Sequence, residues 1–146
     1  MEQIVINTKL DGFVWPGKVV EMDEGAIRSI QSFEDVSDVI CLEALAQLGA
    51  LHIRHGIELK RHVFLMKILH STLPKTAKIT GRYSLSGILK GQTDQSWLYH
   101  LSAKLKEGND LFGGVFLFGT IDYNDNFKKD VLQSHYLKVF SCSNIG

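Results

Sequence analysis

The sequence lacks the features that mark several protein classes. Its two cysteines, Cys41 and Cys142, form neither a disulfide framework nor the spacing of a zinc site, which fits a reducing compartment. The first ten residues lack the basic start and apolar run of a signal peptide, and no apolar run reaches the ~18 residues of a membrane span. We therefore expect a cytoplasmic protein with no metal site and no cofactor.

The chain also has no excess of positive or negative charge. The chain has 16 lysines and arginines and 16 aspartates and glutamates, so no overall field attracts nucleic acid or an anionic membrane. There is no glycine-rich phosphate loop, no Ser-His-Asp order and no aromatic-basic pattern for nucleic acid. Lys60, Arg61, Lys67 and Lys75 would suit an acidic carrier protein or a coenzyme A phosphate, although such clusters are more often ordinary surface. We expect a partner that is small or local in its contacts.

The most distinctive segment runs from Val39 to Gly56 and is apolar on almost all sides except for Glu43, Gln47 and Arg54. At 3.6 residues per turn these three side chains share one side of a helix. A helix that is apolar on most faces is normally buried, so Glu43 is interpreted as a site residue. The alternative is a first-turn acid favoured by the helix dipole. Arg54 is expected to snorkel at an exposed helix end.

The chain has 146 residues, the length of one globular domain, and its other segments predict an α+β fold with one helix and several strands. We expect a hairpin of Lys18–Met22 and Ala26–Phe33, whereas the apolar run His62–Leu69 indicates a central strand covered on both sides. Further strands are expected at Lys78–Lys90, Gln95–Lys106 and Leu111–Ile121. An N-terminal arm is expected over 1–17 and a short amphipathic helix over 126–140. One curved antiparallel sheet around the helix would bury its apolar faces, making 1–146 a single domain.

The helix start LEALAQ, Leu42–Gln47, followed by a meander of long strands, resembles the hot-dog fold of the 3-hydroxyacyl-[acyl-carrier-protein] dehydratases. By element order the resemblance covers Lys18 to Ile121. It implies an acyl chain bound between helix and sheet in a dimer, delivered as a thioester on acyl carrier protein or coenzyme A. It also implies acid/base chemistry by Glu43, with Gln47 holding the site in place.

Two further groups of residues are candidates for contact with this thioester. The free backbone amides at the helix N-terminus, near Asp38 and Val39, would polarise the thioester carbonyl, although the Asp38 carboxylate opposes negative charge there. Phe64 and Met66, in the apolar run, are the candidate contacts for the acyl chain.

The sequence departs from the dehydratases just before the helix. The family carries a His-Phe-Pro-Gly segment there, whereas Ser32–Asp38 keeps only Phe33, and no histidine precedes Glu43. Loss of water from a 3-hydroxyacyl thioester needs a base and an acid, so a lone glutamate would serve as both. The six histidines, taken singly, fit ordinary surface or core positions.

Three hypotheses follow. The first is a protein similar to the dehydratases. The second is an acyl-CoA or acyl-carrier-protein thioesterase that uses Glu43 without a histidine. The third is a non-catalytic acyl-binding subunit, which would pair with a histidine-bearing hot-dog chain.

Overall fold

The computed structural model describes residues 16–73, 78–108 and 110–122. Most of the predicted N-terminal arm and the whole of the predicted helix over 126–140 lie outside these residues. The elements are β1 (Lys18–Met22), β2 (Ala26–Ser37), α1 (Asp38–Gly56), β3 (His62–Thr72), β4 (Lys78–Gln92), β5 (Ser96–Leu105) and β6 (Leu111–Ile121).

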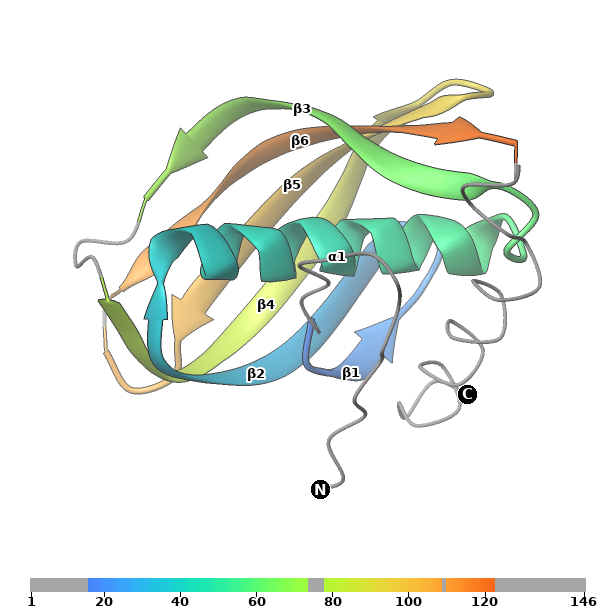
Figure 1. Ribbon diagram of the computed structural model, residues 1–146. Coiled ribbons are helices and arrows are strands. Elements are labelled where there is room, and N and C mark those ends of the chain that lie inside the picture. Colours follow the sequence, from blue (N-terminus) through green and yellow to red (C-terminus); the bar gives the residue numbers. More distant parts are fainter. Residues whose placement is uncertain (1–15, 74–77, 109, 123–146) are drawn as a thin grey trace.

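The described strands form one antiparallel sheet in the order β1-β2-β4-β5-β6-β3. The sheet curves around α1, which lies along its concave side (Figure 1). The predicted fold class, one helix wrapped by a curved antiparallel sheet, is confirmed. No helix in the described ranges has the length and apolar character that crossing a bilayer requires.

The core lies between α1 and the concave face of the sheet. Along β5 the side chains of Trp97, Tyr99, Leu101 and Ala103 are buried, as the alternating pattern predicted. From the helix, Leu45 and Leu48 are fully buried against them. The helix also approaches β6 closely, since a Cβ on Gly49 would lie 2.8 Å from Cζ of Phe118. Apolar faces from every layer therefore meet in one core.

Strand β2 continues directly into α1. Its pairing with β4 shifts register between Phe33 and Val36, so Glu34 and Asp35 form a bulge. Asp35 has φ 49°, and its amide donates a 2.9 Å hydrogen bond to Oγ1 of Thr80. Pairing resumes beyond the bulge, which is why the strand extends past its predicted end at Phe33. A two-residue bulge thus stands in the segment just before the helix.

The prediction that the run from His62 is a central strand covered on both sides is wrong. Strand β3 lies at the edge of the sheet beside β6 (Figure 1). Only its first two residues, His62 and Val63, are buried, and the nine that follow are exposed. Two register shifts interrupt its pairing with β6. An apolar run indicates that the side chains of a strand are buried in the native protein. It does not indicate whether the same chain or a second chain buries them.

Candidate functional site

Glu43 and Gln47 lie one turn apart on α1, and both are half-buried. Oε1 of Gln47 is buried and accepts no hydrogen bond from any described residue. A buried oxygen without a donor costs about 1–3 kcal/mol, so a group that supplies a donor there would be bound favourably. These two predicted site residues are the ones that the structure brings together.

Arg54 continues the same helix face but does not snorkel. Its side chain is buried, and Nη2 donates a 3.1 Å hydrogen bond to the carbonyl oxygen of Val63. The predicted exposed position is therefore wrong, because the start of β3 covers the last turn of α1. Arg54 anchors this end of the helix rather than meeting solvent.

The helix N-terminus is open to solvent. Val39 is exposed, and its amide donates a 2.9 Å hydrogen bond to Oδ1 of Asp38. Ser37, in the capping position, makes no side-chain cap. An oxyanion at the Val39 amide would therefore displace the Asp38 carboxylate. This local bond opposes the predicted role of Asp38 and Val39 in holding a thioester oxygen.

Phe64 and Met66 lie on the outer face of the sheet, away from α1. A Cβ on Gly119 would lie 2.8 Å from Sδ of Met66 and 3.2 Å from Cζ of Phe64. The preceding residue, Phe118, points at the helix, and consecutive strand residues point to opposite faces. The structure therefore does not bring these two predicted acyl-chain contacts together with Glu43 within one chain.

His52 is buried in the core, and the sequence alone did not indicate which groups it contacts. Its Nε2 lies 2.6 Å from the carbonyl oxygen of Asp23, which only accepts, so Nε2 carries the proton. Nδ1 then accepts a hydrogen bond from the Tyr99 hydroxyl. Burial lowers the pKa of His52 despite the bond to Asp23. This neutral imidazole joins α1 to β5 and to the turn between β1 and β2, which is a structural role.

A second missed group lies beneath the start of α1. The Tyr83 hydroxyl donates a 2.7 Å hydrogen bond to Oδ2 of Asp110. Burial raises the pKa of Tyr83, and the Asp110 carboxylate raises it further. Burial, with the charges of Asp38 and Asp110, also raises the pKa of the Cys41 thiol to about 11. Cys41 is fully buried, as predicted for a core residue, and a thiol with that pKa is a poor nucleophile near neutral pH. Asp110 carried no sequence signal because it lies in a turn.

Metal ligands were not predicted. Within the three described ranges, no three or more histidine, cysteine, aspartate or glutamate side chains are grouped so that they could hold a metal ion.

Comparison with known proteins identifies the type of fold. No family model and no curated protein sequence matches the chain. Solved structures that match include a Staphylococcus aureus thioesterase, with 6% identity, TM-score 0.61, and coverage of 70% of this chain and 90% of that one. A hypothetical thioesterase of Streptococcus pneumoniae with coenzyme A has 12% identity, TM-score 0.59, and coverage of 72% and 85%. The dehydratase heterocomplex of Xenorhabdus doucetiae has 10% identity, TM-score 0.60, and coverage of 81% and 88%. The chain has the hot-dog fold of these proteins.

Proposed function

We propose that this hot-dog protein hydrolyses acyl thioesters, with Glu43 as the general base. The observation that carries the proposal is the Glu43 carboxylate, half-buried among apolar neighbours on α1, one turn from a buried amide oxygen that accepts no hydrogen bond from any described residue. The similarity to structures of thioesterases, one of them with coenzyme A, supports it.

In hydrolysis one carboxylate can act first as the base and then as the acid, because water loses its proton before the sulfur leaves, whereas dehydration removes the α-proton and protonates the leaving hydroxyl at two different positions. Water attacks the thioester carbonyl carbon while Glu43 takes a proton from it. The carbon–sulfur bond then breaks, and the proton passes to the sulfur, which leaves as a thiol beside the carboxylic acid. Oε1 of Gln47 accepts a hydrogen bond from the water and orients it. With no histidine before Glu43, this is the reaction that the chain's own groups support best.

A second candidate is a dehydratase or its partner subunit. The LEALAQ helix start and the similarity to a dehydratase heterocomplex favour it. In this case Glu43 acts with a histidine from a second hot-dog chain. The acyl chain would be carried by acyl carrier protein or coenzyme A in both candidates.

The proposal includes a dimer formed through β3. An edge strand has unpaired backbone groups, and natural proteins normally protect such edges. Here the exposed stretch of β3 instead carries large apolar side chains, namely Phe64, Leu65, Met66, Ile68 and Leu69. A second copy that pairs along this edge would cover them. Phe64 and Met66 would then contact the partner copy. They would contact an acyl chain only if that chain extended as far as the dimer interface.

The test supplies saturated, 3-hydroxyacyl and enoyl thioesters on both carriers, and follows thiol release and enoyl absorbance in the same samples. We expect thiol release that falls at least about 100-fold in Glu43→Gln, which keeps the side-chain volume but not the charge. Glu34→Gln, a change to an exposed carboxylate on the bulge, is the matched control and should retain activity.

Other outcomes separate the candidates. Glutamate-dependent interconversion of 3-hydroxyacyl and enoyl thioesters without thiol release would replace hydrolysis by dehydration. The purified chain could also show neither activity, while a histidine-bearing hot-dog chain that co-purifies with it restores dehydration. This result would establish the role of a partner subunit. Unchanged thiol release in Glu43→Gln would remove Glu43 from the mechanism.

A further inference from the structure

The outer face of the sheet carries a hollow of about 260 Å³ where β3, β5 and β6 lie side by side. Its lining includes four polar side chains, His70, Thr72, His100 and Ser102, around Gly113. We call it the outer hollow. It lies on the opposite face of the sheet from α1 and Glu43, so it is separate from the proposed hydrolytic site.

Strand register explains why these side chains converge. Val115 of β6 pairs with His100 on one side and His70 on the other, so the two imidazoles lie in one row across three strands. Gly113 pairs in the same way with Ser102 and Thr72. The two rows lie two residues apart and therefore share one face.

Gly113 keeps the floor of the outer hollow open. Its φ of 152° is one that other residues rarely adopt, and an added Cβ would collide with the carbonyl oxygen of Leu101. No side chain can therefore fill the space between the two hydroxyl-bearing residues. The hollow is a consequence of the fold at this position.

The strands that line the outer hollow carry basic side chains and no carboxylate, although the whole chain is neutral. Strands β3 to β6 contain no aspartate or glutamate, and their basic residues are Lys67, Lys78, Arg82, Lys90 and Lys104. Lys104 pairs with Leu111, which lines the hollow. The neighbouring carboxylate in the sequence, Asp110, is engaged by Tyr83 of the core. The local field therefore favours an anion.

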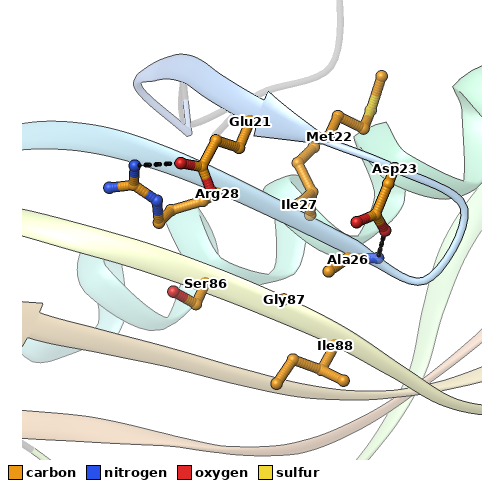
Figure 2. A pocket seen from close by; sticks show the side chains of 9 residues that line it. All are labelled: Glu21, Met22, Asp23, Ala26, Ile27, Arg28, Ser86, Gly87 and Ile88. Carbon is orange, nitrogen blue, oxygen red and sulfur yellow. Dashed lines mark hydrogen bonds and ion pairs between the residues drawn. The ribbon is translucent and has the colours of Figure 1, made fainter.

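A second hollow of similar size, about 240 Å³ between β1, β2 and β4, provides a contrast. There Arg28 is engaged by Glu21 at 2.9 Å, and the Asp23 carboxylate accepts a 2.8 Å hydrogen bond from the Ala26 amide (Figure 2). Its cation is neutralised and it contains two carboxylates. The outer hollow differs from this second hollow in that hydrogen-bond donors line it without carboxylates.

We propose that the outer hollow binds a phosphate group. Imidazole N–H and hydroxyl groups donate to phosphate oxygens, and the surrounding lysines add long-range attraction. The volume is below the ~300–1,000 Å³ of pockets for drug-sized ligands, so the hollow holds the phosphate rather than a whole larger molecule. Inorganic phosphate, a phosphorylated coenzyme and a lipid headgroup share this chemistry.

The test follows the backbone amide NMR signals of the full chain during separate titrations at constant ionic strength. The probes are inorganic phosphate, coenzyme A, and vesicles of phosphatidylglycerol and phosphatidylcholine, the last also measured by co-sedimentation. We expect saturable shifts at Gly113, Gly114 and Val115 with at least one probe, and the probe that binds most tightly identifies the source. Shifts that stay linear or absent with all three would overturn the proposal.

Variants assign the binding to the outer hollow. The double variant His70→Ala/His100→Ala should weaken binding at least about tenfold, whereas His55→Ala, which removes an exposed histidine from the end of α1, should not. Thr72→Val, nearly isosteric, provides a second variant in case the double variant does not fold. Unchanged affinity in a folded variant of either kind would overturn the assignment, and unchanged binding in Glu43→Gln would separate this site from hydrolysis.

Discussion

Nη2 of Arg54 donates a hydrogen bond of 3.1 Å to the carbonyl oxygen of Val63, and this bond ties the last turn of α1 to the buried start of β3. Beyond Val63 the strand is exposed as far as Thr72. The bond therefore marks the boundary between the part of β3 that its own chain covers and the edge that we expect a second copy to cover.

Replacing Arg54 by methionine should lower the free energy of unfolding by about 2 kcal/mol, because the change leaves a buried carbonyl oxygen without its charged donor. Chemical denaturation monitored by circular dichroism measures the loss. Arg28→Met is the matched control, since the exposed Arg28–Glu21 pair should contribute less than about 1 kcal/mol. Equal losses in the two variants would contradict the structural role of Arg54.

Gly49 and Gly56 should respond in opposite ways to alanine. A Cβ on Gly49 would lie 2.8 Å from Cζ of Phe118, so overpacking should destabilise Gly49→Ala by about 1–3 kcal/mol. Around Gly56 no atom lies within 4 Å of an added Cβ, so Gly56→Ala should be neutral or stabilising by up to about 1 kcal/mol. Thermal unfolding of both variants checks the pair, and a stabilised Gly49→Ala would contradict the close contact between α1 and β6.

The free energy of unfolding should fall as the pH is lowered through the range in which His62 is protonated in the unfolded chain but not in the folded one. Burial, with the charge of Arg54, lowers the pKa of His62 from 6.5 to about 4. The unfolded chain therefore binds a proton below pH 6.5 while the folded chain does not until about pH 4, so the free energy of unfolding decreases across this interval by up to about 3 kcal/mol. Denaturation at several pH values, with His62→Gln for comparison, measures this contribution. An identical pH slope in the variant would show that His62 does not contribute.

Dimer formation should depend on the apolar edge of β3. Leu69 is 49% exposed there, and Leu69→Lys should weaken dimerisation at least about tenfold because a charge replaces apolar surface at the interface. Ile88→Lys is the control, since Ile88 is 45% exposed but lies on the interior strand β4. Analytical ultracentrifugation over a range of concentrations gives both constants. A larger effect of Ile88→Lys would move the interface from the strand edge to the face of the sheet.

Local pattern predicted most of the fold. The helix begins one residue before its predicted start and ends at Gly56, and Leu111–Ile121 is a strand with the predicted bounds. The alternation along β5 predicted which of its side chains are buried. These features follow from side-chain periodicity and turn residues, which act between neighbours in the chain. The resemblance carried by Leu42–Gln47 supplied the architecture, which matching solved structures confirm.

The candidate site was only partly predictable. Glu43 and Gln47 share a helix face, and helical spacing alone places them there. The edge position of β3, the burial of Arg54 and the outward direction of Phe64 and Met66 depend on which strands pair and on a shift in register between Leu65 and Lys67. The row of His70, Val115 and His100 likewise exists only because β6 lies between β3 and β5. The elements and the helix face of Glu43 follow from the order of residues, because they depend on near neighbours in the chain. Which side chains meet across strands follows from the tertiary fold, because hydrogen-bond register joins residues far apart in the chain.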